Sequence, residues 1–209
     1  MAAPRVTPMT ELLPAAETVY IGLGANLDDP RAHVERAAAD LGGLPASRLE
    51  GLSWLYRTAP VGPADQPDYI NAAARLRTRL TPWALLGALQ QIERRHGRVR
   101  DGTRWGPRTL DLDILLFGAR RSERPSLRLP HPEIRRRAFV LVPLAEVAPA
   151  ALDIPGQGRL DVLLAAVPKD GVAALAPIRS ALPAVAFPGE PRPVDDARGH
   201  AEPPRAALS

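Results

Sequence analysis

Residues 110–116 (LDLDILL) constrain the fold of this chain more than any other segment. Every second residue in it is apolar, which is the period of a β-strand with one face in a hydrophobic core. Successive side chains of a strand point to opposite faces of its sheet. Asp111 and Asp113 are therefore predicted to share one face, so the chain must form a sheet that holds two carboxylates close together.

The rest of the chain predicts further strands and helices. Alternating apolar residues predict strands at residues 18–23, 52–56, 70–76 and 126–129. Capping residues followed by proline, and helical spacing of apolar residues, predict helices at residues 28–41, 81–97 and 132–148. We expect the last helix to be interrupted at Pro143, and residues 44–48 and 59–67 to form loops. The order of elements predicts an α+β fold, with a ferredoxin-like antiparallel sheet and helices packed on it in a layered α/β/α sandwich.

Composition predicts one folded domain with extensions. The 209 residues are 45% hydrophobic, which is enough for a single core. We expect a flexible segment at residues 1–17, the domain at 18–177, and a disordered tail rich in Pro, Ala and Arg at 178–209. No apolar run reaches the roughly 18 residues of a membrane span, and no secretory signal is evident, so a cytoplasmic location is expected. The chain has no cysteine, so any metal must bind to carboxylates or histidines.

The chemistry of the paired carboxylates depends on their neighbours. Alone, Asp111 and Asp113 fit an ordinary polar strand face. Four arginines lie just before them: Arg98, Arg100 and Arg104 lie between Gly97 and Gly106, and Arg108 follows Gly106 by two residues. Carboxylate oxygens suit Mg²⁺ bound jointly with phosphates, and guanidinium groups suit phosphate oxygens. The cluster therefore indicates a polyphosphate site, although a solvated basic loop remains an alternative reading of the arginines.

Two common nucleotide-binding motifs are not found. The chain has no Gly-Lys-Ser/Thr, which excludes a P-loop. Gly22 and Gly24 follow a predicted strand, but Leu27 occupies the third glycine position of a dinucleotide fingerprint. Because Lys169 is the only lysine, arginines must take the usual role of the phosphate-binding lysine.

Residues 104–116 (RWGPRTLDLDILL) resemble the signature of the 6-hydroxymethyl-7,8-dihydropterin pyrophosphokinase family of folate biosynthesis. Other segments resemble the family in matching order and spacing: GLGAN from Gly22, YRTAPVGPADQPDYINAA from Tyr56, QIERRHGRVR from Gln91 and LPHPEIRRRAFVLVPL from Leu129. The resemblance covers roughly residues 18–168. It implies transfer of pyrophosphate from ATP to hydroxymethyl-dihydropterin with release of AMP, with small-molecule substrates and with no nucleic acid or membrane partner; we expect a monomer.

The resemblance also implies roles for particular residues. Asp111 and Asp113 would hold two Mg²⁺ ions, and the catalytic set would be Arg98, Arg108, Asp111 and Asp113. The nucleotide would contact Gln90, Glu93, Arg98, Arg100, Trp105, Arg108, Ile114, His131 and Arg137. The pterin would contact Thr58, Ala59, Pro60, Val61, Tyr69, Asn71 and Phe139, with Phe139 stacking on its ring. Asn26 matches a position that supports the mobile loops.

Several alternatives stay open from the sequence. Tyr69 and Phe139 also fit plain core aromatics, and His131, between two prolines, also fits a turn. The chain departs from the family pattern at Ala25, Ala59 and Arg128, and the last of these puts fine detail of the ATP contacts in doubt. Two rival functions are a nucleic-acid-binding module that stacks bases on Trp105, and a pseudoenzyme that keeps the pterin pocket as a regulator.

Overall fold

A computed structural model describes residues 14–60, 65–98 and 106–179. Its main sheet has six strands, in the order β10, β3, β4, β1, β5, and β2 also pairs with β4. Every pairing in the sheet is antiparallel. The strands are β1 (Glu17–Ala25), β2 (Ser47–Leu52), β3 (Trp54–Thr58), β4 (Tyr69–Thr78), β5 (Asp111–Phe117) and β10 (Ala173–Pro177).

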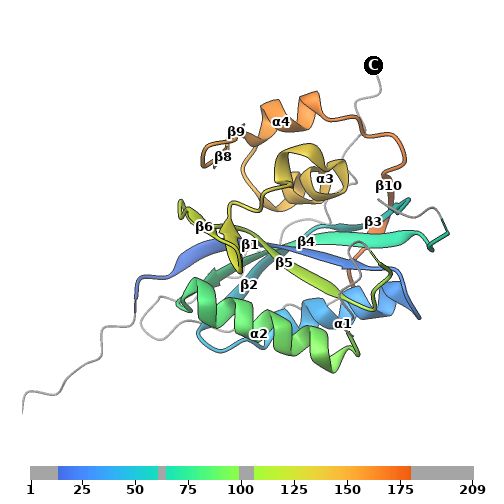
Figure 1. The fold of residues 1–209 in the computed structure, drawn as a ribbon, viewed down its shortest axis with the longest axis horizontal. Helices are drawn as coiled ribbons and strands as arrows, with labels where there is room; N and C mark the ends of the chain where they lie inside the picture. Colours follow the sequence, from blue (N-terminus) through green and yellow to red (C-terminus); the bar gives the residue numbers. More distant parts are fainter. Residues whose placement is uncertain (1–13, 61–64, 99–105, 180–209) are drawn as a thin grey trace, which may run out of the picture.

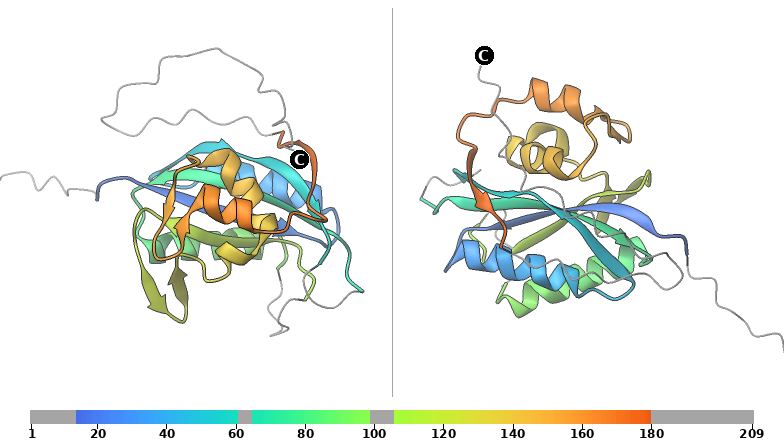
Figure 2. Two further views of the ribbon diagram at one scale, coloured as in Figure 1. Left: turned by 90° about the horizontal axis from the view of Figure 1, so that it is seen from above. Right: turned by 180° about the vertical axis from the view of Figure 1, so that it is seen from behind.

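Helices cover both faces of this sheet. Figures 1 and 2 show α1 (Pro30–Gly42) and α2 (Pro82–Arg95) on one face, and α3 (Ala138–Val147) and α4 (Leu160–Ala166) on the other. Each interface has its own hydrophobic cluster: Leu41, Leu85 and Leu89 belong to the first, and Leu141 and Leu144 to the second. The structure therefore confirms an α+β fold with an antiparallel sheet.

The shorter elements lie outside the main sheet. They are the hairpin of β6 (Ser122–Arg124) and β7 (Leu127–Leu129), the 3-10 turn η1 (Ile134–Arg136), and the hairpin of β8 (Asp153–Ile154) and β9 (Gly158–Arg159). No helix in the described ranges is long and apolar enough to cross a membrane.

The first two helices begin where the sequence predicts. The Asp29 carboxylate accepts a hydrogen bond from the amide of Ala32, and the Thr81 hydroxyl accepts one from the amide of Ala84. Both caps are followed by a proline at the first helical position, where its missing N–H costs nothing. The predicted starts of α1 and α2 are thus confirmed.

The prediction that Pro143 interrupts the third helix is wrong. The break falls at Arg137, whose backbone is extended between η1 and α3, whereas α3 continues through Pro143. A proline removes a single hydrogen bond from the helix, and the fully buried Leu141 and Leu144 hold the segment against the sheet on both sides of it.

Other boundaries also differ from the predictions. Ser47 and Arg48, expected in a loop, begin β2, because they pair with Thr78 and Arg77 of β4. Glu17, expected in the flexible segment, is the first residue of β1. The strands β6 and β10 were not predicted, since both are short and β10 lacks an alternating pattern.

Removing a core side chain from α2 tests this packing. Leu89 is fully buried, so Leu89→Ala should lower the free energy of unfolding by about 2–5 kcal/mol. Urea denaturation followed by circular dichroism measures the change. The control Val162→Ala, on an α4 side chain that is 61% exposed, should change it by less than about 0.5 kcal/mol. Equal losses for both variants would contradict the assigned core.

Candidate functional site

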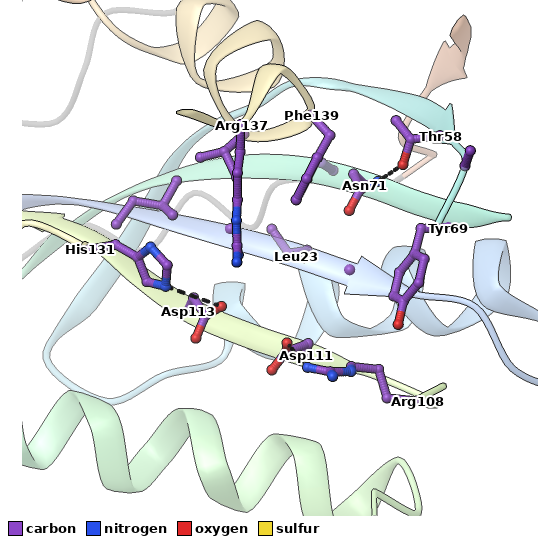
Figure 3. A pocket seen from close by; sticks show the side chains of 16 residues that line it. Leu23, Thr58, Tyr69, Asn71, Arg108, Asp111, Asp113, His131, Arg137 and Phe139 are labelled. Atoms are coloured by element: carbon purple, nitrogen blue, oxygen red, sulfur yellow. Dashed lines mark hydrogen bonds and ion pairs between the residues drawn. The ribbon is translucent and has the colours of Figure 1, made fainter. Parts of the chain in front are cut away.

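A pocket lies over the sheet face that α3 covers, beside the start of that helix (Figure 3). Its floor is formed by β1, β4 and β5. The pocket is lined by Gly22, Leu23, Gly24, Thr58, Ala59, Tyr69, Asn71, Ala72, Arg108, Asp111, Asp113, Leu115, His131, Arg137, Phe139 and Val140. Residues from distant parts of the sequence therefore meet at one site.

Strand register places the polar groups of the floor. In β1, Gly24 pairs with Asp111 of β5 on one side and with Asn71 of β4 on the other. Gly22 likewise pairs with Asp113. A β-carbon on Gly24 would lie 3.2 Å from the Asn71 Oδ1 atom, so a side chain there would displace Asn71 or fill the pocket. The glycines thus leave an open floor between the carboxylates and Asn71.

Asp111 is held by two arginines. Its Oδ1 atom accepts a hydrogen bond from Arg98, and its Oδ2 atom lies 2.5 Å from the Arg108 Nη1 atom. Arg98 also donates to Glu93, a buried carboxylate that accepts a 2.9 Å hydrogen bond from the amide of Leu112. Burial acts to raise the pKa of Asp111, but the two guanidinium groups hold that pKa below its ordinary value. Asp111 is therefore ionised at neutral pH.

Asp113 is in a different electrostatic environment. Protein atoms packed around the carboxylate, together with the neighbouring charge of Asp111, raise the pKa of Asp113 from 3.8 to about 7. The side chain still opens into the pocket and is 49% exposed, so solvent weakens the contribution of desolvation, whereas the charge of Asp111 acts in either case. The Asp113 Oδ2 atom lies 3.9 Å from the His131 Nε2 atom. Because two carboxylates this close repel each other, a cation bound to both would be stabilised and would lower the pKa of Asp113.

His131 has a defined neutral form. Its Nδ1 atom accepts a 3.2 Å hydrogen bond from the amide of Glu133, so the ring proton is on Nε2, which faces Asp113. Burial, followed by the positive charge of Arg137, lowers the pKa of His131. The imidazole is therefore a neutral hydrogen-bond donor toward the pocket.

The part of the pocket beneath α3 is less charged. Phe139 projects from α3 over the floor, Asn71 and Thr58 lie on the sheet near it, and the Tyr69 ring points toward Arg108 (Figure 3). The Asn71 side-chain amide donates a 2.8 Å hydrogen bond to the Thr58 hydroxyl, which fixes its orientation. The Tyr69 hydroxyl donates to the carbonyl of Gly106 at 3.2 Å. Aromatic faces with a few fixed polar groups suit a planar heterocycle.

Asn26 links the segments around the pocket. Its side-chain amide donates to the carbonyl of Pro67 at 3.2 Å, and its Oδ1 atom accepts from the amide of Arg108 at 2.7 Å. The backbone amide of Asn26 also donates a 3.0 Å hydrogen bond to the backbone carbonyl of Arg108. These bonds connect the segments that precede β4 and β5, which fits the loop-supporting role that the family resemblance implies for Asn26.

The structure brings most of the predicted site residues together. Those that line the pocket are Thr58, Ala59, Tyr69, Asn71, Arg108, Asp111, Asp113, His131, Arg137 and Phe139. Predicted residues that do not line it are Pro60, Gln90, Glu93, Arg98 and Ile114. Ile114 is buried in the core on the side of α1 and α2, because it alternates with Asp113 along β5. Val61, Arg100, Arg104 and Trp105 lie outside the described residues.

The sequence reading missed several pocket residues, chiefly Gly22, Gly24, Leu115 and Val140. Residues two apart on a strand point to the same face, and this rule could have identified some of them. Leu115 is two residues after Asp113, and Gly22 and Gly24 are two residues apart at the end of a predicted strand. Pairing partners were needed to place the glycines between the carboxylates and Asn71. Arg128, the departure noted from the sequence, is exposed on β7 and does not line the pocket.

The donor set fits a metal shared with a ligand. Within the described ranges no group of three or more His, Asp or Glu side chains is arranged to hold a metal ion. Two carboxylates on one strand face supply only part of an oxygen coordination shell. Mg²⁺ commonly binds through one or two carboxylates together with substrate phosphates and water, and Asp111 and Asp113 match that pattern.

Comparisons with known proteins agree with this geometry. Residues 20–149 match the family described as 7,8-dihydro-6-hydroxymethylpterin-pyrophosphokinase (HPPK). The chain is 51% identical over 156 residues to 2-amino-4-hydroxy-6-hydroxymethyldihydropteridine pyrophosphokinase of Pseudomonas aeruginosa, covering 75% of this chain and 95% of that protein. It is 47% identical over 131 residues to the protein of the same name from Haemophilus influenzae, covering 63% and 81%.

Solved structures give the same picture of the fold. Wild-type Plasmodium falciparum HPPK-DHPS superimposes with a TM-score of 0.56 at 13% identity, over 74% of this chain and 42% of that chain. The present chain thus spans less than half of that protein. At this identity the similarity supports the fold alone.

The raised pKa of Asp113 predicts a pH-dependent stability. The folded protein holds this proton more tightly than the unfolded chain, whose carboxyl titrates near 3.8, so the contribution is present below that pH and is lost as pH rises to about 7. In urea unfolding without metal, the stability of the wild type relative to Asp113→Asn should therefore fall between pH 5 and pH 8. The exposed control Asp153→Asn, on β8, should show no such trend. A constant difference between wild type and Asp113→Asn would refute the assigned shift.

Proposed function

Because the chain belongs to the 7,8-dihydro-6-hydroxymethylpterin-pyrophosphokinase family, we propose that it transfers pyrophosphate from ATP to 6-hydroxymethyl-7,8-dihydropterin, a step of folate biosynthesis. The products are AMP and the pterin diphosphate. The observation that carries the proposal is the single pocket with a carboxylate pair at one end and an aromatic and amide end opposite it. These two ends suit the triphosphate and the pterin, respectively.

Asp111 and Asp113 are the proposed metal ligands, and two bound Mg²⁺ ions would neutralise phosphate charge and lower the pKa of the attacking hydroxyl. Arg98 and Arg108 are the proposed catalytic cations, because both reach the carboxylate of Asp111. When the triphosphate binds, its oxygens compete for these guanidinium groups. The arginines then stabilise charge that develops during transfer.

The remaining nucleotide contacts are also proposals. His131, a neutral donor beside Asp113, and Arg137, at the start of α3, face the same end of the pocket (Figure 3). Gln90 and Glu93 of α2 and the backbone of Ile114 complete the set on the described residues. Arg100 and Trp105 are retained from the resemblance alone.

The pterin would lie between α3 and the sheet. Phe139 stacks on its ring, and Tyr69 borders it. Asn71, oriented by Thr58, reads its amide-like edge, with backbone groups of Thr58, Ala59, Pro60 and Val61 nearby. In this pose the hydroxymethyl oxygen would face the carboxylate pair.

The reaction is a displacement at the β-phosphorus of ATP. The hydroxymethyl oxygen forms a bond to the β-phosphorus, and the bond between that atom and the oxygen bridging it to the α-phosphorus breaks, releasing AMP. Bound metal would lower the pKa of the hydroxyl, whose proton could then pass to solvent without a dedicated protein base. Phosphoryl transfer of this kind depends mainly on positioning and charge neutralisation.

Broader features of the protein are proposed on the same basis. Without β2 and β10, the strand order of the sheet is β5, β1, β4, β3, with one helix after β1 and another after β4. This arrangement fits the ferredoxin-like class. The helices on both faces of the sheet fit a layered α/β/α sandwich. We place the catalytic domain at residues 18–177, extended by Glu17, which begins β1, and by Ile178, which packs against the core. The remaining residues on either side are flanking segments, and we propose a monomer of the cytoplasm.

Removal of a proposed metal ligand tests the reaction. Asp113→Ala should lower kcat for AMP formation by at least about 100-fold, because it removes a proposed ligand of the metal ions that would position the phosphates. AMP is measured by chromatography in the presence of ATP, Mg²⁺ and hydroxymethyl-dihydropterin, and circular dichroism checks the fold. The control Glu123→Ala, on exposed β6, should retain wild-type turnover. Near-normal AMP release by a folded Asp113→Ala variant would overturn the metal assignment.

Dependence on the metal is tested separately. AMP formation by the wild type should stop when EDTA removes Mg²⁺ and return when excess Mg²⁺ is added. The described residues offer no group of three or more metal ligands, so EDTA should compete effectively with the pair Asp111 and Asp113. Turnover that persists in EDTA would show that the arginines suffice without a metal.

A further inference from the structure

Glu146, on α3, is a carboxylate that the proposed reaction does not use. It is half-buried and reaches across to β3. Its Oε2 atom accepts a 2.7 Å hydrogen bond from the amide of Trp54, and its Oε1 atom accepts a hydrogen bond from the Tyr56 hydroxyl. One side chain therefore ties the helix to two points of a single strand.

The helix side of this tie leads to Phe139. Glu146 and Phe139 are seven residues apart on α3, which is about two helical turns, so both side chains lie on the same side of the helix. Their separation along the axis is about 10 Å. A tilt or lift of α3 at Glu146 would therefore move Phe139 relative to the pocket floor.

The strand side of the tie leads to Thr58 and Asn71. Tyr56 and Thr58 are two residues apart on β3 and share its face, and Tyr56 pairs with Asn71 of β4. Asn71 in turn donates its side-chain hydrogen bond to Thr58. The anchor residue Tyr56 is thus adjacent to the polar pair that faces Phe139 across the pocket (Figure 3).

The chemistry of the tie favours a carboxylate. Tyr56 is only 5% exposed, and burial together with its hydrogen bond to Glu146 raises the pKa of its hydroxyl, which stays a donor at all physiological pH values. The Trp54 amide is also a donor. Two donors from one strand need two acceptors, and the two carboxylate oxygens provide them. An apolar residue at position 146 would leave both donors without these partners, which is costly in a buried setting.

We propose that Glu146 is a positioning residue for the pterin: through Tyr56 and the Trp54 amide it sets the spacing between Phe139 and the pair of Thr58 and Asn71. The proposal rests on the proposed function, because it takes this end of the pocket as the pterin site. We expect the larger effect of Glu146 on the pterin, since Asp111, Asp113 and Arg108 of the phosphate end are on β5 and the segment before it, and Arg137 is the one proposed nucleotide contact that adjoins α3.

Steady-state kinetics of Glu146→Ala, Glu146→Gln and Tyr56→Phe test the proposal. Glu146→Ala should raise the KM for hydroxymethyl-dihydropterin by about 10-fold to 100-fold, and the KM for ATP by much less, because only Arg137 of the proposed nucleotide contacts would move with α3. Glu146→Gln should restore part of the pterin affinity, because its amide oxygen accepts from the Trp54 amide and its NH₂ group donates to the Tyr56 oxygen, although the Tyr56 hydroxyl loses its acceptor. Tyr56→Phe, which keeps the bond to Trp54, should give an intermediate increase.

Direct binding separates positioning from loss of fold. Pterin affinity is measured by calorimetry and thermal unfolding by circular dichroism, with Glu123→Ala on β6 as the control. If Glu146→Ala does not fold, Glu146→Gln and Tyr56→Phe give the same comparison. Unchanged pterin KM and affinity in folded variants, or equal losses for both substrates, would overturn the positioning role. A wild-type chain that forms no AMP would instead refute the proposed function, and with it this proposal.

Discussion

The pairing of β1 between β4 and β5 is the constraint on which the pocket depends. It aligns Asp111, Gly24 and Asn71 in one row across three strands. A shift of either neighbour by a single residue would turn its polar side chains to the opposite face, into the core beneath α1 and α2. The buried residues of the two neighbours, such as Leu76 of β4 and Leu112 of β5, oppose any such shift, because they would lose their place in that core.

Charge compensation follows from this register. Two carboxylates on one strand face repel each other, and the structure distributes the cost unequally. Arg98 and Arg108 hold Asp111 in its charged form, whereas Asp113 opens into the pocket with a raised pKa. In the proposed reaction this asymmetry makes the site receptive to cations and to phosphates. The same arginines that stabilise Asp111 are then available to an anionic ligand.

The wall of the pocket opposite the floor is positioned by different contacts from those that fix the floor. It comes from α3, which begins at the extended residue Arg137 and packs on the sheet through Leu141 and Leu144. Because the helix belongs to a different hydrophobic cluster from α1 and α2, its placement over the floor depends on its own contacts. Hydrogen bonds from Trp54 and Tyr56 to Glu146 are among them.

Local patterns in the sequence determined the elements with strong periodicity and the polar face of β5. Asp111 and Asp113 share that face because strand geometry alone requires it, and the starts of α1 and α2 follow from caps that act within one turn. Weak or overridden signals misled the prediction: β2 exists because β4 pairs with it, and Pro143 stays helical because core packing outweighs one lost hydrogen bond. Only the tertiary structure decided which strands are neighbours. It therefore also decided that Gly24 separates Asp111 from Asn71 and that Glu146 reaches Tyr56. Those contacts join residues up to 90 positions apart, and no local preference of the chain specifies them.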